Sequence, residues 1–254
     1  MQSIIEFGFI IEEHNMIARN AIDWHTGIAR NFDQKYTTSK NFRERYSIWT
    51  DIIDKYSNDK FLVLDIGCGS GVFSFYSAER NKEVIGIDAS EKMLQICFEK
   101  LDELATKNVK FINGNIESLS QHVDHKADMV ICSSVLEYID DLDASIELIK
   151  QSMNVDGVFL LSMPNKQSLY RKLEALSYKL FGRPKYYKYV KNVCTLDEMT
   201  IKLKRFGFST MEYKYYGETT FLSAIFRKMR LPQYSDNLYV IVARVLSGQT
   251  EAKS

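Results

Sequence analysis

The chain has 254 residues, which is enough for one domain with a substantial core. Hydrophobic residues make up 45% and charged residues 26% of it, and the formal net charge is zero. This balance is typical of a globular protein and gives the molecule as a whole no electrostatic bias toward nucleic acid or a membrane surface. The four cysteines are widely spaced and form no CxxC pair, which favours free thiols over a disulfide framework. The sequence contains no recognisable signal peptide or membrane-spanning apolar run, so we expect a cytoplasmic protein.

Helices are predicted for residues 10–56, which would form an N-terminal cap covering residues 1–56. One apolar stripe recurs at spacings of four and three and consists of Ile10, His14, Ile17, Ala21, Trp24 and Ile28. His25 lies beside this stripe and is the candidate general base. The alternative for His25 is a packing role in the helix.

At residue 61 the pattern changes to short apolar runs separated by helical segments, and the main domain is predicted to occupy residues 57–254. The predicted strands are residues 61–64, 84–88, 109–112, 128–132, 158–162, 208–216 and 238–245, with a helix at 196–205 before the last two. Alternation of buried strands and helices indicates βαβ crossovers and a mostly parallel sheet.

A basic segment at residues 166–191 follows the fifth predicted strand. It holds eight Lys and Arg residues and one acid, Glu174, in an otherwise neutral chain. Leucines recur within it at helical spacing, at positions 169, 173, 176 and 180. Two interpretations stay open. The segment lies on an anionic membrane surface, or its leucines pack on the domain and its lysines face solvent or an anionic substrate.

A glycine-rich turn, residues 65–71 (DIGCGSG), connects the first strand to a helix. Such a turn lets the backbone approach a ligand closely because no side chain intervenes. The dinucleotide fingerprint G-x-G-x-x-G is not met, since its sixth position is Val72. Asp65 offers an anion to a ligand ammonium group. Asp88 ends the second strand 21 residues after Gly67, where a carboxylate can accept both ribose hydroxyls; the alternative for Asp88 is to cap the next helix.

These segments together resemble the Rossmann-like class I S-adenosylmethionine-dependent methyltransferases. Residues 62–71 resemble the family's first motif and residues 86–94 its second, while residues 113–117 and 128–138 resemble the motifs of the third and fourth strands. The resemblance covers nearly the whole chain, from about Trp24 to Val245. It is nearest to the small-molecule branch, which includes ubiquinone-biosynthesis O-methyltransferases and enzymes that tailor natural products and glycans.

For the methionine end of the cofactor, the resemblance implies a lining of Asp65, Gly67, Cys68, Gly69 and Gly71, with Ser133 and Ser134 near the sulfonium. Cys68 is expected to fill space in the turn rather than act as a nucleophile. Arg45 would bind the methionine carboxylate, and Tyr36 would close over the bound cofactor. Both residues also have a purely structural interpretation, in which Arg45 joins helices or lies at the surface.

For the nucleoside end, the resemblance implies that Asp88 binds the ribose and that Ala89 and Met93 pack on the adenine. Ile116 would cover the opposite adenine face. Asn115 stands where the family more often has Asp, and its carbonyl oxygen would accept from the adenine N6 amine.

The resemblance also implies the fold: α/β, with a Rossmann-like seven-stranded sheet in the order 3-2-1-4-5-7-6, in which only the last strand is antiparallel. The N-terminal helical cap and a helical insert after the fifth strand, residues 166–191, would complete it.

The expected reaction is methyl transfer to a small-molecule or lipid-linked acceptor, at oxygen, with nitrogen and carbon as alternatives. We expect no metal, because residues 132–134 and 163–165 lack the carboxylates of the metal-dependent catechol type. We expect no nucleic-acid substrate, because residues 132–135 replace the Asn/Asp-Pro-Pro-aromatic motif. Three other classes stay open: a nicotinamide oxidoreductase, a non-catalytic adenosylmethionine-binding protein, and an adenosylmethionine enzyme that transfers no methyl group.

Overall fold

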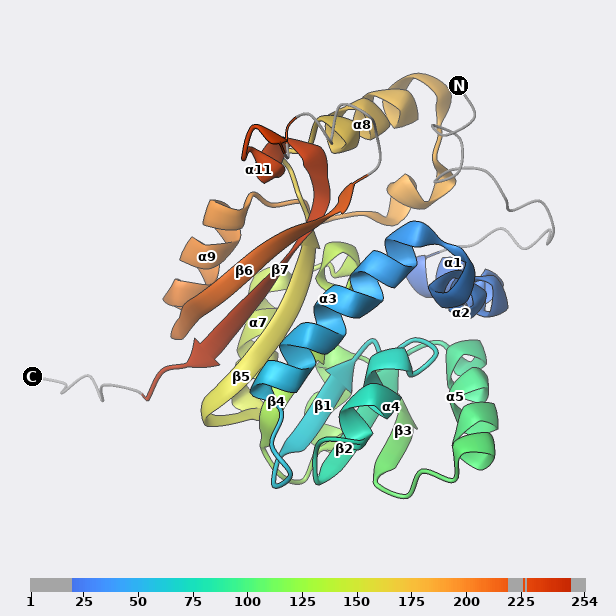
Figure 1. Ribbon diagram of the computed structural model, residues 1–254, viewed down its shortest axis with the longest axis vertical. Coiled ribbons are helices and arrows are strands. Elements are labelled where there is room, and N and C mark those ends of the chain that lie inside the picture. The colour runs from blue at the N-terminus through green and yellow to red at the C-terminus, as the bar shows by residue number, and fades with distance from the viewer. Residues whose placement is uncertain (1–19, 219–225, 227, 248–254) are drawn as a thin grey trace, which may run out of the picture.

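The computed structural model describes residues 20–218, 226 and 228–247. Within them, one seven-stranded sheet has the order β3-β2-β1-β4-β5-β7-β6 (Figure 1). The first part of the predicted N-terminal stripe, including His14, lies outside the described residues. The predicted fold class and strand order are confirmed.

The strands begin and end close to their predicted positions, except that β5 is longer. Their bounds are β1 Leu62–Ile66, β2 Glu83–Asp88, β3 Val109–Asn113, β4 Ala127–Cys132, β5 Met153–Pro164, β6 Phe208–Glu218 and β7 Asp236–Val245. β1 pairs in parallel with β2 and β4, and β4 in parallel with β5. β7 is antiparallel to both β5 and β6, so it is the one reversed strand, as predicted.

Helices cover both faces of the sheet, and the side chains of β1 alternate between the two layers. Val63 faces a core shared with α3 (Lys40–Tyr56), α4 (Val72–Ala78) and α5 (Glu91–Leu104). Leu64 faces the other core, which includes side chains of α7 (Leu142–Gln151), α9 (Leu196–Arg205) and the η1–α6 segment (Ile116–Ser118 and Leu119–His122). Trp49 of α3 is fully buried. Since α3 is one of the covering layers, the predicted cap is continuous with the domain, and the boundary at residue 56 stays a prediction.

Two further groups of helices lie at the carboxyl ends of the parallel strands. The first is α1 (Ala21–Gly27) with α2 (Ala29–Thr38), which contacts the start of α5 through Ala29, Phe32, Met93 and Ile96. The second is the insert, with α8 (Leu169–Phe181) and η3 (Lys185–Tyr189), beside α11 (Pro232–Ser235) (Figure 1). The short η2 segment (Leu136–Tyr138) follows β4 between these two groups. The helical insert after β5 is therefore present where the sequence predicts it.

Candidate active site

The glycine turn lies at the carboxyl ends of β1 and β2, and its backbone conformation requires glycine. Gly67 has φ +66°, and a β-carbon added to it would lie 2.2 Å from Cγ2 of Val135. Gly69 has φ +56°, and the nearest atom to an added β-carbon is on the Phe32 ring at 3.9 Å. The Gly67 amide donates to the Ile87 carbonyl over 2.7 Å, which fixes the turn to β2. The turn is thus held rigidly, with backbone exposed to a ligand at Gly69.

Asp88 supports the turn and keeps capacity for a ligand. One carboxylate oxygen accepts from the Gly69 amide over 2.8 Å, and the other accepts from the Ser90 amide over 2.8 Å. The cap of α5 is Ser90 itself, whose hydroxyl accepts from Met93, so the alternative of Asp88 as the cap is not what the structure shows. A carboxylate has about four acceptor positions, so Asp88 has room for two ribose hydroxyls.

Asp65 is buried just below the turn, where it accepts a 2.6 Å hydrogen bond from the Ser74 hydroxyl. Burial raises the pKa of this carboxyl to about 7, and the negative charge of Asp88 adds to the increase. A ligand ammonium beside Asp65 would restore its charged form. Cys68 is also buried, and burial raises the pKa of its thiol, so a filling role fits it better than a nucleophilic one.

Arg45 of α3 reaches across to the end of β4. Its Nη2 donates to the Ser133 carbonyl over 3.2 Å and to the Ser133 hydroxyl over 2.8 Å. Its Nε atom is buried and has no hydrogen-bond partner among the described residues. An unpaired guanidinium nitrogen beside the glycine turn fits a ligand carboxylate. The structure thus brings Arg45 together with Ser133, as the resemblance implies. Ser134 follows in the same loop, and its backbone amide donates to the Ser162 hydroxyl.

An aromatic cluster covers the methionine end of the site. Tyr36 packs edge-on against Phe32, Phe42, Tyr46 and Phe73, with ring centroids 5.1–6.4 Å apart. Burial raises the pKa of the Tyr36 hydroxyl. The positive charge of Arg45 opposes this increase, and the negative charge of Asp65 adds to it. The Phe32 ring lies nearest to Gly69, and its place at the site was not predicted from the sequence. The sequence offers one indication of this place, because Phe32 precedes Tyr36 by four residues in the same helix.

The residues assigned to the nucleoside end are partly engaged in local structure. Met93 is 3% and Ile116 is 2% exposed, and each lies in a different apolar cluster. Asn115 caps η1, because its side-chain oxygen accepts from the Ser118 amide over 3.1 Å. That oxygen therefore has one lone pair left for the adenine N6 amine, and its role there stays a prediction. Ala89 lies between Asp88 and the cap of α5, half-buried.

A polar cluster joins η2 to the insert, and no sequence motif predicts it. Glu174 is 6% exposed and accepts a 2.7 Å hydrogen bond from Arg171 and another from the Tyr186 hydroxyl. Tyr138 lies between this cluster and α1, where its ring meets that of His25 at 5.1 Å. Burial, together with the positive charge of Arg45, lowers the pKa of His25 to about 4. His25 is thus at the site and neutral, and its role as a base stays a prediction.

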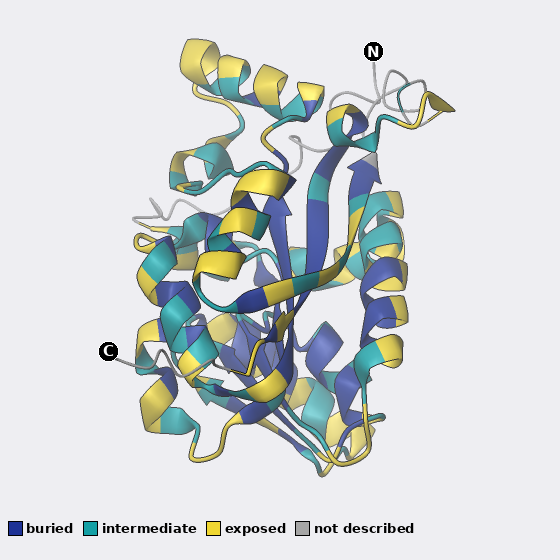
Figure 2. Cartoon of the chain, turned by 90° about the vertical axis from the view of Figure 1, so that its left-hand side faces the viewer, coloured by how far each residue is buried: buried dark blue, intermediate teal, exposed yellow. Residues whose placement is uncertain are grey.

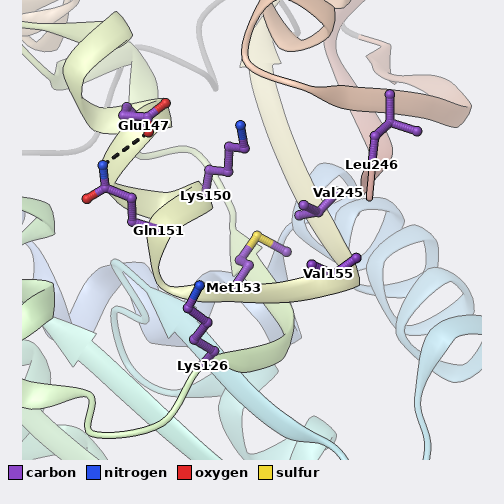
Figure 3. Close-up of a pocket in the computed structure, with 8 residues that line it drawn as sticks. All are labelled: Lys126, Glu147, Lys150, Gln151, Met153, Val155, Val245 and Leu246. Atoms are coloured by element: carbon purple, nitrogen blue, oxygen red, sulfur yellow. Dashed lines mark hydrogen bonds between the residues drawn. The ribbon is translucent and has the colours of Figure 1, made fainter. Parts of the chain in front are cut away.

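The pocket drawn in Figure 3 is a different place. It has a volume of about 250 Å³ and lies where β5 begins and β7 ends, among Lys126, Met153 and Val245, at the opposite end of the strands from the glycine turn. The described residues contain no group of three or more His, Cys, Asp or Glu side chains that could hold a metal ion.

A family model described as a methyltransferase domain matches residues 57–212. The chain belongs to this methyltransferase family. Its fold and motifs place it among the class I S-adenosylmethionine-dependent methyltransferases, as the sequence predicts.

Individual relatives match this methyltransferase over part of their length. The probable S-adenosylmethionine-dependent methyltransferase CRG1 of Saccharomyces cerevisiae is 31% identical over 133 residues, 51% of this chain and 45% of that protein. A ubiquinone biosynthesis O-methyltransferase of Nitrosospira multiformis is 31% identical over 104 residues, 41% of this chain and 43% of that protein. The chain thus spans less than half the length of these relatives. The N-methyltransferase NodS of Bradyrhizobium japonicum, solved with S-adenosylhomocysteine, has a TM-score of 0.64 at 12% identity, covering 90% of this chain and 100% of that one. At that identity the likeness shows the fold.

Proposed function

We propose that this methyltransferase transfers the methyl group of S-adenosylmethionine to a hydroxyl oxygen of a small-molecule or lipid-linked acceptor. The observation that carries the proposal is the donor and acceptor set around the glycine turn. The unpaired Nε of Arg45 would bind the methionine carboxylate, Asp65 would face its ammonium, and Asp88 would accept the ribose hydroxyls. The set suits a methionine moiety, with its two opposite charges, better than a pyrophosphate, which has only negative charge.

Oxygen as the methylated atom is supported by the similarity to ubiquinone biosynthesis O-methyltransferases. Methyl transfer is an in-line displacement, so the chain must align the acceptor behind the methyl group and keep water out. The elements α1, η2 and η3 contact one another on the side from which the acceptor would approach. Trp24 of α1 and Tyr189 of η3 meet there with ring centroids 6.1 Å apart.

To test this function, the wild-type protein is titrated by calorimetry with S-adenosylhomocysteine and, separately, with NAD. We expect binding of the first and none of the second. Binding of NAD alone would favour the oxidoreductase alternative and contradict the proposal.

We also propose that α8 rests on an anionic bilayer and that the acceptor is collected there. No helix in the described ranges is long and apolar enough to cross a membrane. The large apolar side chains of α8 face outward, with exposed fractions from 39% to 75%, at Leu169, Leu173, Leu176, Leu180 and Phe181. This exposure supports the membrane-facing interpretation over the one in which the leucines pack on the domain. In Figure 2 the helix along the top of the molecule is coloured mainly as exposed or intermediate.

The charges around α8 complement such a surface. Lys172, Lys179, Lys185 and Lys188 are exposed. The one acid of the segment, Glu174, is buried against Arg171, so it does not offset them. An interfacial helix places its apolar side chains at the acyl boundary and its lysines at anionic headgroups. Each such lysine contributes about 1 kcal/mol to membrane binding.

Flotation with vesicles tests the membrane proposal. We expect the wild-type protein to float with phosphatidylglycerol-containing vesicles at low salt and to stay behind with phosphatidylcholine vesicles. Leu173→Ser with Leu180→Ser should abolish flotation, whereas Ile201→Ser on α9, where Ile201 is 63% exposed, should not change it. Absence of flotation at low salt would contradict the proposal and leave the site to a dissolved acceptor.

A further inference from the structure

Glu137 presents a buried carboxylate oxygen for which the described part of the chain supplies no hydrogen-bond donor. The residue lies in η2, just beyond the end of β4, and is 4% exposed. Its Oε2 has no hydrogen-bond partner among the described residues. Leaving a buried charged acceptor unpaired is costly, so such an oxygen in a folded protein points to a donor supplied by something that binds.

The surroundings of Glu137 place it at the acceptor side of the cofactor site. It follows Ser133, the residue held by Arg45, by four positions. Its carbonyl accepts from the amides of Lys191 and Asn192 over 2.7 and 3.0 Å, which fastens η2 to the end of the insert. Ligands in this architecture lie beyond the carboxyl ends of the strands. Glu137 is therefore buried at the carboxyl ends of the strands, where the charges of both Arg45 and Arg171 reach its carboxyl group.

We propose that Glu137 accepts the proton of the acceptor hydroxyl as its oxygen takes the methyl group. The inference rests on the proposed function. The hydroxyl oxygen attacks the methyl carbon, a C–O bond forms and the C–S bond breaks, and the bonding pair passes to sulfur. The proton moves to Oε2 of Glu137. The products are the methyl ether, S-adenosylhomocysteine and a protonated Glu137, which later loses its proton to water.

The electrostatics make Glu137 a better base than His25. Burial raises the pKa of Glu137 to about 7, although a hydrogen bond from its own backbone amide and the positive charges of Arg45 and Arg171 oppose the increase. His25, with a pKa of about 4, holds a proton far more weakly. A base is most effective when its pKa lies near the working pH. The remaining carboxylate of the cluster, Glu174, is already engaged by Arg171 and Tyr186.

A cofactor analogue tests this placement without knowledge of the acceptor. In sinefungin a carbon that bears an amino group replaces the methylated sulfonium, so its ammonium occupies the place of the transferred methyl. Calorimetry gives the ratio of sinefungin to S-adenosylhomocysteine affinity in the wild-type protein and in Glu137→Gln, which keeps the shape and removes the charge. Glu137→Asp, whose carboxylate is withdrawn by one methylene, is the second variant in case Glu137→Gln does not fold. Asp140→Asn is the matched control, because its exposed side chain carries the same charge in the same loop.

We expect the wild-type protein to prefer sinefungin by about tenfold or more, the effect of one charge-assisted hydrogen bond. Glu137→Gln should lose that preference while binding S-adenosylhomocysteine as before, Glu137→Asp should weaken it, and Asp140→Asn should keep it. A ratio near one in the wild-type protein, or an unchanged ratio in either Glu137 variant, would overturn the inference and leave the proposed function intact. Failure of the wild-type protein to bind either compound would overturn the proposed function and the inference with it.

Discussion

At the scale of single residues, one substitution of Asp88 removes both an interaction within the glycine turn and an expected interaction with the cofactor. It holds the Gly69 amide and would accept the ribose hydroxyls. We expect Asp88→Ala to weaken S-adenosylhomocysteine binding at least about tenfold, since each charge-assisted hydrogen bond is worth ~1.5–3 kcal/mol. Calorimetric titration measures this, with the melting temperature as a check on folding. Unchanged affinity would show that Asp88 does not bind the ribose hydroxyls.

The residues predicted correctly as neighbours are those whose role is local and those, such as Arg45 and Ser133, that the family resemblance implies. The glycines act through the backbone of one turn, and the requirement for positive φ at Gly67 and Gly69 is visible in the residue type itself. Phe32 and Glu137 could not be assigned in this way. Their importance comes from contacts with elements distant in sequence, such as the carbonyl of Glu137 with residues 191–192, and no local pattern reports such contacts.

At the scale of elements, the ion pair between Asp33 and Lys100 joins α2 to α5 beside the glycine turn. Lys100 of α5 donates to Asp33 of α2 over 2.5 Å and to the Ser70 carbonyl of the turn over 3.2 Å. We infer that α2 must loosen for the cofactor to leave. We expect Asp33→Asn to speed dissociation of S-adenosylhomocysteine up to about fivefold, because partly exposed ion pairs contribute at most ~1 kcal/mol.

Stopped-flow displacement measures this dissociation rate, and Arg30→Gln is the control. Arg30 joins the same pair of helices through Glu99, but over 3.6 Å and with both side chains largely exposed. The control should leave the rate unchanged. A rate that is equal in the two variants would show that the Asp33–Lys100 pair does not hold α2 closed.

Helices and strands could be predicted from the sequence where the periodicity of their apolar residues reflects which side chains are buried. The βα units have strong apolar runs, and their strands were located within a few residues. The orientation of α8 was not predictable, because a stripe of leucines at helical spacing has the same sequence whether it faces the domain or solvent. Only the packing shows that Leu173 and Leu180 are each 62% exposed.

At the scale of the whole molecule, buried carboxyls make stability depend on pH. Asp65 and Glu137 have pKa values of about 7 in the folded chain, against about 4 when unfolded. The folded state therefore binds more protons between these values, and the free energy of unfolding falls as pH rises through this window. His25 opposes the trend below about pH 6.5, because its folded pKa is about 4. We expect the ligand-free protein to lose ~1–2 kcal/mol between pH 6 and pH 8.

Urea unfolding at the two pH values measures this loss, and Asp65→Asn should reduce it because it removes one of the two carboxyls. Stability that rises between pH 6 and pH 8 in the wild-type protein would contradict the protonation states assigned to the site.

Transfer of labelled methyl groups tests the central claim most directly. The wild-type protein is incubated with S-adenosylmethionine labelled in its methyl group and a cell extract, which is then separated into small-molecule, lipid, protein and nucleic-acid fractions. Gly69→Val, which places a branched side chain at φ +56° where the cofactor must approach, is the inactive control. The account predicts label in the small-molecule or lipid fraction with the wild-type protein and none with the variant. Label in protein or nucleic acid, or equal label with the two proteins, would contradict it.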